Sequence, residues 1–352
     1  MDIDATKLDD FMGRFVQDLG AVMHAATIVV GDRLGLYKAL ARDGAQTPSE
    51  LALRTETDPR YVREWLCAQA ASGYVNYDAL RERFYLTAEQ AFALTVEGGP
   101  AFIPGAFDIA VAQFKAIPKI TSAFRTGLGL GWHEHDEALF HGTERFFRPG
   151  YAANLVASWI PSLPGLEARL RAGAEVADVG CGHGASTLIM AEAFAASRFV
   201  GFDYHEPSVQ RAREAARRAG LQDRVRFEVA GAKAYPGTDY DLVAMFDCLH
   251  DMGDPVGAAA HVRASLKRDG TWMIVEPYAN DALEGNLNPM GRVFYSASTF
   301  ICTPASRAQE VGLCLGAQAG EARLRDVVTQ GGFTQFRRAT QTPFNLVFEA
   351  KP

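Results

Sequence analysis

The sequence has few cysteines, no strong excess of either charge and no long apolar run. Its five cysteines are scattered and form no C-x-x-C pair, which argues against a disulfide framework and a cysteine-based zinc site. The 35 basic and 42 acidic residues give a net charge of −7, so the overall charge does not attract nucleic acid or an anionic membrane. No apolar run approaches the roughly 18 residues of a membrane-spanning helix. The acidic N-terminus lacks a signal-peptide pattern, and we expect a cytoplasmic protein with no membrane partner.

What the sequence does contain is a glycine-rich turn between a predicted strand and a predicted helix. Residues 175–187 read EVADVGCGHGAST, an apolar strand followed by three alternate glycines. Glycines at such a turn let a ligand approach the backbone closely, because no Cβ stands in the way. The helix that follows offers free backbone N–H groups in its first turn. An ordinary glycine-rich βα turn has the same local pattern, so further evidence is needed.

The next predicted strand supplies that evidence. It ends on Asp203, roughly 20 residues past the loop, where an acid can accept hydrogen bonds from both ribose hydroxyls of a nucleoside. The glycine loop and Asp203 together predict a nucleoside cofactor site. The sequence shows no P-loop lysine, no G-x-S-x-G elbow and no zinc motif, so no other catalytic motif competes with this interpretation.

Strands and helices alternate from residue 167 onward. This alternation predicts an α/β domain over 167–352 with a doubly wound, mostly parallel sheet, whose ligand lies beyond the carboxyl ends of the strands. We expect an irregular insertion at about 278–320, then a helix at 321–330. The domain closes with an antiparallel pair of strands, 333–338 and 345–349, which forms a reversed C-terminal hairpin.

The N-terminal part, 1–101, has the pattern of a winged-helix domain. A long predicted helix, 8–41, precedes two helices that begin at Pro48 and Pro59 and a pair of strands within 74–86. Basic and acidic residues are nearly balanced here, whereas a surface that binds nucleic-acid phosphates carries clustered positive charge. The first helix is apolar on more than one side, so we expect a homodimer formed through this domain. A DNA-binding regulator that senses a metabolite is the alternative.

A helical connector is expected over 102–166, with an aromatic and polar middle. It contains three of the eight histidines, at 133, 135 and 141. Imidazole and carboxylate groups suit several divalent ions. The spacing fits no defined metal motif, so we favour a polar lid over a pocket and predict no metal.

These features resemble the class I S-adenosylmethionine (SAM) methyltransferases with an N-terminal winged-helix domain. The likeness is nearest to the plant-type small-molecule O-methyltransferases and their bacterial relatives, and it spans nearly the whole chain. The segments that carry it are DVGCGHG at 178–184, Asp203, LHDMGD at 249–254, KRDG at 267–270 and GGF at 331–333.

The resemblance implies that SAM is the cofactor. The glycine loop would hold the methionine part of SAM, and Asp203 would hold its ribose. Gly231 and Ala232, after the third strand, would flank the adenine, and Phe246 and Asp247, after the fourth strand, would line the cofactor. Tyr151 is added because it lies shortly before the glycine-loop strand. Gly231 stands where an acid often flanks adenine. The expected cofactor contacts are Tyr151, Asp178, Gly180, Cys181, Gly182, Gly184, Asp203, Tyr204, Gly231, Ala232, Phe246 and Asp247.

The resemblance also identifies His250 and Glu276 as candidate catalytic residues. Plant-type enzymes place a catalytic histidine between two glutamates, and His250 and Glu276 match the histidine and the first glutamate. The position of the second glutamate falls near Gln318. A histidine with a pKa near neutrality can remove a proton from a hydroxyl acceptor. His250 is therefore either the base, with Glu276 behind it, or a residue that only shapes the pocket.

We thus expect an enzyme that transfers a methyl group from SAM to a small, aromatic or otherwise apolar acceptor, at oxygen first, with nitrogen or carbon as alternatives. Aromatic residues around a few polar groups are typical of a small-molecule site. The expected acceptor contacts are Trp132, His133, His135, His141, Phe147, Phe294 and Tyr295.

Overall fold

The computed structural model describes residues 3–352, which form two compact units. Of the described residues, unit 1 combines 3–111 with His141–Pro149, and unit 2 combines Ala112–Phe140 with Gly150–Pro352. The residues of the expected connector, 102–166, fall in both units.

Unit 1 contains the winged-helix pattern expected from the sequence. Its antiparallel hairpin follows four helices. The elements are α1 (Ala5–Arg33), α2 (Leu36–Asp43), α3 (Pro48–Thr55), α4 (Pro59–Ala71), β1 (Asn76–Asp78), β2 (Arg83–Tyr85) and α5 (Ala88–Thr95). The single helix expected over 8–41 was wrong, because Gly35 adopts a φ of +69° and separates α1 from α2. Left-handed backbone of this kind ends an α-helix.

The core of unit 1 lies where α1 meets the later helices. Ile28, Leu40, Leu51 and Leu66 are buried there. Helix α3 is capped at its start, since the Thr47 hydroxyl accepts a hydrogen bond from the backbone N–H of Glu50, 3.3 Å away. The first half of α1 contributes nothing to this core, and its apolar side chains are exposed.

Two long helices contain residues of both units. They are α6 (Pro104–Thr126) and α7 (Glu137–Asn154). The aromatic and polar middle of the expected connector contains helix α7, whose start is capped by the Asp136 carboxylate, which accepts from the Ala138 N–H at 3.1 Å. Short turns complete this part: η1 (Trp132–Glu134), η2 (Leu155–Trp159) and η3 (Ile160–Ser162).

Unit 2 is built on the expected mostly parallel sheet, which has seven strands in the order β5-β4-β3-β6-β7-β9-β8. The first five strands in this order are parallel, and β9 pairs antiparallel with both β7 and β8. The strands are β3 (Glu175–Val179), β4 (Arg198–Asp203), β5 (Val225–Val229), β6 (Tyr240–Phe246), β7 (Leu266–Pro277), β8 (Gln335–Gln341) and β9 (Asn345–Lys351).

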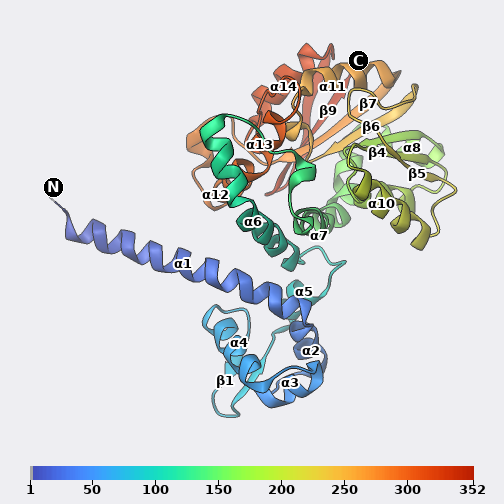
Figure 1. Ribbon diagram of the computed structural model, residues 1–352. Coiled ribbons are helices and arrows are strands. Elements are labelled where there is room, and N and C mark those ends of the chain that lie inside the picture. The colour runs from blue at the N-terminus through green and yellow to red at the C-terminus, as the bar shows by residue number, and fades with distance from the viewer. Residues whose placement is uncertain (1–2) are drawn as a thin grey trace. The chain divides into compact units, whose positions relative to one another are not determined.

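Helices cover this sheet, with α10 beside β5 and with α11 and α14 near β7 and β9 (Figure 1). The insertion expected as irregular over 278–320 contains helices α12 and α13. The helices and turns of unit 2 are α8 (Leu166–Ala172), α9 (Ala185–Ala193), α10 (Glu206–Arg218), η4 (Leu249–Asp251), α11 (Pro255–Ser265), η5 (Leu283–Asn286), α12 (Pro289–Phe300), α13 (Cys302–Arg307) and α14 (Gly320–Gln330).

The strand order places a switch point at β3. The chain adds β4 and β5 on one side of β3, then returns to add β6 and β7 on the other, and ligands of doubly wound sheets bind where the order reverses. Val243, Trp272, Ile274 and Phe348 are fully buried in the sheet, so the strands give a rigid base to the residues at their ends.

The length and the apolar character of the helices show whether one of them could span a membrane. Among residues 3–352, no single helix is long and apolar enough to cross a membrane. Taken together, α1 and α2 have the length and composition that such a helix needs, but the chain bends by 65° at the break between them.

Candidate active site

The glycine loop leaves β3 as a tight turn at the switch point. Gly180, Gly182 and Gly184 have φ values of +80°, +52° and +81°. A Cβ on Gly180 would lie 2.6 Å from Sγ of Cys248, whereas at Gly182 nothing lies within 4 Å of that position. The backbone is therefore packed on one side and open at Gly182, which is the arrangement a closely bound ligand needs.

Asp203, at the end of β4, is fixed beside this loop. Its Oδ2 accepts a hydrogen bond from the Gly182 N–H at 2.9 Å, and its Oδ1 accepts from the His205 N–H at 2.8 Å. Burial raises the pKa of Asp203, and these two backbone donors partly offset that effect. An ionised carboxylate has about four acceptor sites, so Asp203 keeps the capacity to accept from two ribose hydroxyls.

Asp178 supports the loop from within β3. Its Oδ2 accepts hydrogen bonds from the hydroxyls of Ser186 and Thr187, each at 2.6 Å, and so ties the start of α9 to the strand. Its Oδ1 is buried and has no hydrogen-bond partner among residues 3–352. Burial raises the pKa of Asp178 to about 6, and the two hydroxyls oppose that rise.

Asp247 follows β6 with a φ of +50°, which is rare for a residue other than glycine. Its Oδ2 accepts from the Tyr151 hydroxyl at 2.7 Å and its Oδ1 accepts from the Asn345 side-chain amide at 2.9 Å. Burial raises the pKa of Asp247 to about 7, with a further rise from the nearby charge of Glu276. The structure thus brings the expected residues Tyr151 and Asp247 together.

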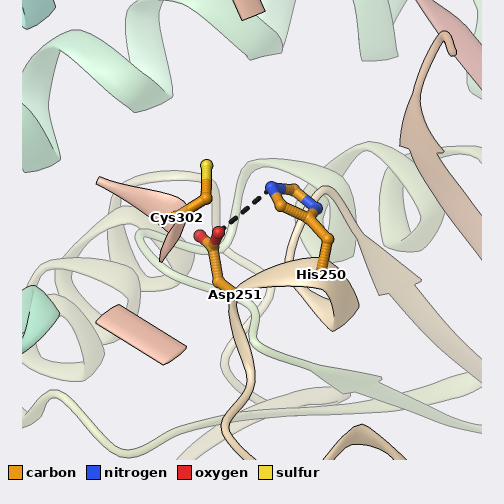
Figure 2. A group of neighbouring side chains, drawn as sticks. All are labelled: His250, Asp251 and Cys302. Atoms are coloured by element: carbon orange, nitrogen blue, oxygen red, sulfur yellow. Dashed lines mark ion pairs between the residues drawn. The ribbon is translucent and has the colours of Figure 1, made fainter. Parts of the chain in front are cut away.

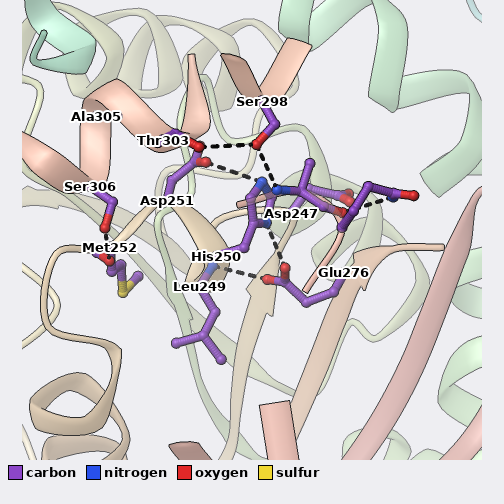
Figure 3. A network of polar contacts seen from close by, with 12 residues as sticks. Asp247, Leu249, His250, Asp251, Met252, Glu276, Ser298, Thr303, Ala305 and Ser306 are labelled. Atoms are coloured by element: carbon purple, nitrogen blue, oxygen red, sulfur yellow. Dashed lines mark hydrogen bonds and ion pairs between the residues drawn. The ribbon is translucent and has the colours of Figure 1, made fainter. Parts of the chain in front are cut away.

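His250 lies in η4, next to the end of β7. Its Nδ1 is 2.5 Å from Oε2 of Glu276, whose Oε1 accepts from the Leu249 N–H at 3.0 Å (Figure 3). Its Nε2 is 3.1 Å from Oδ1 of Asp251. Burial lowers the pKa of His250, but the charges of Asp251 and Glu276 outweigh burial and hold it well above its usual value. Both ring nitrogens of His250 therefore face a carboxylate.

The histidines of η1 and its neighbour lie in the same unit as this site. The His133 ring is 6.1 Å from the ring of Tyr204, and Phe140 lies 4.5 Å from the ring of His205. The expected lid therefore contacts the residues that follow Asp203. His135 is buried, neither of its ring nitrogens has a hydrogen-bond partner among residues 3–352, and burial lowers its pKa to about 4.

The other expected contacts are distributed along the chain. His141 and Phe147 belong to unit 1, so their contact with an acceptor stays a prediction. Phe294 is buried on α12 and the neighbouring Tyr295 is partly exposed. Phe300, at the end of α12, lines an apolar hollow of about 390 Å³ together with residues of α6. The remaining cofactor residues all lie at the carboxyl ends of parallel strands: Gly180, Cys181, Gly182 and Gly184 after β3, Tyr204 after β4, Gly231 and Ala232 after β5, and Phe246 on β6.

Sequence reasoning missed three residues that the structure brings to this edge. Asp251 belongs to the LHDMGD segment at 249–254, and its place next to His250 is the signal that could have identified it. Cys302 lies close to both residues, but it is 52 positions away and carries no local pattern. Asn345 reaches Asp247 across 98 positions, and nothing local announces this pairing.

The residues present fit SAM. The open face of Gly182 accepts a close ligand, and the unpartnered Oδ1 of Asp178 suits a hydrogen-bond donor or a positive charge. Asp203 stands where it can accept from a ribose. The residues that would hold SAM are therefore the glycine loop, Asp203 and the residues directly after β5 and β6. His250 lies next to them, near the end of β7, and is not one of them.

Comparisons with known proteins agree with this geometry. Residues 170–311 match a family described as "Methyltransferase domain", and residues 22–96 match the "Rv2258c-like winged HTH domain". A 27-O-demethylrifamycin SV methyltransferase of Amycolatopsis mediterranei is 39% identical over 87 residues, which cover 24% of this chain and 32% of that relative.

Solved structures share the fold over the full length. An O-methyltransferase family protein from Burkholderia thailandensis has a TM-score of 0.70 at 18% identity and covers 100% of this chain and 99% of its own. Human N-acetylserotonin methyltransferase, solved in complex with SAM, has a TM-score of 0.67 at 15% identity, with 99% and 98% covered. Residues 170–311 thus carry a methyltransferase domain and residues 22–96 a winged helix-turn-helix domain, and the solved methyltransferase structures share the fold of the whole chain.

Proposed function

We propose that the protein transfers a methyl group from SAM to an oxygen atom of a small, apolar and aromatic acceptor. The observation that carries this proposal is the position of the His250–Glu276 pair, which lies at the strand ends beside the cofactor residues. SAM supplies an electrophilic methyl group on a sulfonium. The chain itself must then align an acceptor with that group and deal with the proton of its hydroxyl.

His250 is our proposed residue for that proton. Glu276 holds the imidazole through Nδ1, which leaves Nε2 as the atom that meets an acceptor. Nε2 also forms an ion pair with Oδ1 of Asp251 at 3.1 Å, and this contact raises the pKa of His250. Asp251 lies too close to Nε2 for a hydroxyl to fit between them, so we propose that the acceptor hydroxyl displaces the Asp251 side chain and donates its proton to Nε2 of the neutral imidazole. Alignment alone can accelerate such a transfer by several orders of magnitude.

The walls of the site support an aromatic acceptor. Trp132 packs against Phe140 with ring centroids 5.3 Å apart, and His133 and His135 lie beside them on the chain. Apolar walls with a few polar groups are expected for small ligands. We propose that these residues, with Phe294 and Tyr295 of α12, contact the acceptor.

A screen with labelled SAM tests the proposal. Phenols, catechols, amines and thiols would each be incubated with the protein, and transfer would be measured in the extracted product. Labelled O-methyl ethers are the expected products. Labelling of amines or carbon alone would replace O-methylation by one of the two other methyl-transfer reactions, and failure to bind SAM in calorimetry would remove the function altogether.

A DNA-binding regulator is the second candidate, because residues 22–96 match a winged helix-turn-helix domain. The charges of this domain oppose it. Arg60, Arg81 and Arg83 are each paired with a carboxylate, at 2.6, 3.0 and 2.7 Å. Binding to duplex DNA that weakens steeply as salt rises would support a regulator, and no binding at low salt would eliminate it.

We also propose a homodimer, formed through unit 1. Phe11, Phe15 and Leu19 of α1 are between 47 and 65% exposed, although burial of such side chains stabilises a protein by about 1.5–3 kcal/mol each. A cytoplasmic location is proposed because all five cysteines are free thiols, as expected in a reducing compartment.

A further inference from the structure

Three polar groups meet beside the proposed acceptor position. Nε2 of His250, a carboxylate oxygen of Asp251 and Sγ of Cys302 all lie within 4.8 Å of one another (Figure 2). His250 and Cys302 are buried, at 3% and 6% exposure, whereas the side chain of Asp251 is 23% exposed. Asp251 is therefore the member of this cluster that has room to move.

His250 carries a positive charge in this arrangement. Its Nδ1 lies 2.5 Å from Glu276 and its Nε2 lies 3.1 Å from Asp251, so a doubly protonated ring can donate to a carboxylate on each side. Burial lowers the pKa of His250, but the charges of Asp251 and Glu276 outweigh burial and hold this pKa well above its usual value. A doubly protonated imidazole cannot accept a further proton. The proposed base is therefore unavailable while Asp251 stays on Nε2.

Cys302 offers the carboxylate of Asp251 a second position. Burial raises the pKa of the Cys302 thiol to about 11, so the thiol keeps its proton at neutral pH and can donate a weak hydrogen bond. In the same site the thiol of Cys248 lies 3.3 Å from the Val179 carbonyl oxygen that accepts from it. Asp251 would reach the same distance from Cys302 by moving no more than about 1.5 Å, the difference between 4.8 and 3.3 Å.

The backbones on both sides of this cluster are held in place. Turn η4, which carries Asp251, packs directly against α13, which begins with Cys302. The Ser306 hydroxyl donates to the Met252 carbonyl at 2.8 Å, and the Gln309 amide donates to the Asp251 carbonyl at 3.0 Å. These bonds involve neither the carboxylate of Asp251 nor the thiol of Cys302. The carboxylate can therefore pass from Nε2 to the thiol by a rotation of one side chain.

We propose that Asp251 is a latch on His250. It holds Nε2 protonated until the acceptor enters, and it then moves to the thiol of Cys302, so that Asp251 and Cys302 are positioning residues of the reaction. The Nε2 proton leaves with the displaced carboxylate and passes to solvent, which leaves a neutral ring to take the acceptor proton. This inference rests on the proposed function, in which His250 is the base. A base that is free only while the acceptor is present takes no proton from water in its absence.

Titration of His250 tests the latch without any substrate. The full-length protein would be labelled with isotopes in its histidines and followed by NMR as the pH rises, with His250→Gln to assign the resonance. In Asp251→Asn the midpoint should fall by about 1–3 pH units, because the ring loses one of its two neighbouring charges. The other titratable neighbours of the ring stay unchanged in this variant: Glu276, Asp247 and the thiols of Cys248 and Cys302. Asp223→Asn alters an exposed acid and is the matched control, so it should leave the midpoint in place.

Calorimetry tests the part played by Cys302. The probe is the acceptor found in the screen, or phenol if the screen finds none, with S-adenosylhomocysteine bound so that no methyl group is transferred. At a pH where His250 is protonated, binding of the probe should release about one proton, measured from the dependence of the heat on the buffer. Cys302→Ala should weaken probe binding roughly 2–10-fold, because the displaced carboxylate loses a hydrogen-bond donor. Cys302→Ser keeps a donor and should restore the affinity. Cys67→Ala is the control, because Cys67 is exposed in unit 1.

The outcomes separate this inference from the proposed function. An unchanged midpoint of His250 in Asp251→Asn overturns the latch, and so does probe binding without release of a proton. Equal probe binding by the wild type and Cys302→Ala overturns the movement to the thiol. Circular dichroism shows whether each variant is folded, and Asp251→Ala takes the place of Asp251→Asn if that variant is not. The titration needs no ligand, so it decides even if neither probe binds. Methylation at oxygen by a protein whose midpoint is unchanged keeps the proposed function and removes the latch.

Discussion

The hydroxyl of Tyr151 donates a hydrogen bond to Oδ2 of Asp247 at 2.7 Å, across 96 positions of sequence. This bond joins the end of α7 to the end of β6, and Asn345 from β9 completes the same carboxylate. Three segments that are remote in sequence thus fix one side chain at the edge of the sheet where we place the cofactor.

Tyr151→Phe should therefore weaken both folding and SAM binding. The substitution keeps the ring and removes one hydrogen bond to a charged acceptor, which costs about 1.5–3 kcal/mol in the free energy of unfolding. Chemical denaturation measures the stability and calorimetry the affinity. Tyr61→Phe is the control, because Tyr61 is 81% exposed. Equal stability of the wild type and Tyr151→Phe would show that the bond contributes nothing.

Asp203→Ala should lose most of the SAM affinity. The change removes the acceptor for two ribose hydroxyls. The loss of each charge-assisted hydrogen bond should cost about 1.5–3 kcal/mol in the free energy of SAM binding. Asp203→Asn, which retains one acceptor oxygen beside Gly182, should lose less. Asp223→Ala alters an exposed acid and should bind SAM normally. Unchanged affinity of Asp203→Ala, or tight NAD binding by the wild type, would contradict the assignment.

The buried Asp178 predicts a pH-dependent stability. Its pKa is raised to about 6 in the folded protein from 3.8, so the folded state binds its proton more tightly than the unfolded state does. The stability contribution of Asp178 is therefore greatest below about pH 4 and falls as pH rises to about 6, by roughly 3 kcal/mol in total.

Asp178→Asn isolates this effect, since asparagine keeps an oxygen for Ser186 and Thr187 but does not titrate. The difference in unfolding free energy between wild type and variant should move in favour of the variant from pH 4 to pH 7. Denaturation curves at several pH values measure that difference. A difference that is constant with pH would mean that Asp178 titrates normally.

The exposed apolar side chains in the first half of α1 predict which substitution disrupts the proposed dimer. Phe15→Glu places a charge among apolar side chains that we expect to be buried against a second copy, so the mass in light scattering should fall to that of a monomer. Leu53→Glu is the control, because Leu53 is 81% exposed on α3, and it should leave the dimer intact. A monomeric wild type at micromolar concentration would refute the proposed dimer.

The sequence predicts those parts of the fold that depend on local signals. The glycine loop and Asp203 are recognised because a strand end and its turn are encoded by adjacent residues. The same is true of the parallel strands and of the closing hairpin, which carry apolar runs of strand length. The break at Gly35 was missed because the apolar periodicity continues across it, and α12 was missed because Gly and Asn residues precede it.

The relations between remote residues could not be predicted. Asn345 reaches Asp247 only because β9 inserts between β7 and β8, a pairing that depends on the whole sheet. Cys302 approaches His250 only because α13 packs on η4. The orientation of Asp251 toward Nε2 of His250 follows from the geometry of a single turn, which residue types alone do not specify.

His250→Ala tests the catalytic proposal. If His250 removes the acceptor proton, turnover should fall by roughly 10²–10⁴-fold, the usual contribution of general acid–base catalysis. SAM affinity should remain unchanged, because His250 is not among the residues that we expect to hold SAM. The measurements are turnover with the acceptor found in the screen and SAM affinity by calorimetry.

His261→Ala is the matched control for this experiment. His261 lies on α11, where its ring nitrogen bonds the Tyr235 carbonyl at 2.9 Å, so its loss should spare turnover in a folded protein. Glu276→Gln extends the test, since it keeps the shape of the residue behind His250 but removes its charge. If Glu276 only orients the ring, this variant should retain more turnover than His250→Ala. Near-normal turnover of His250→Ala would leave alignment of the two substrates as the whole mechanism, because no proton transfer to the imidazole would then be required.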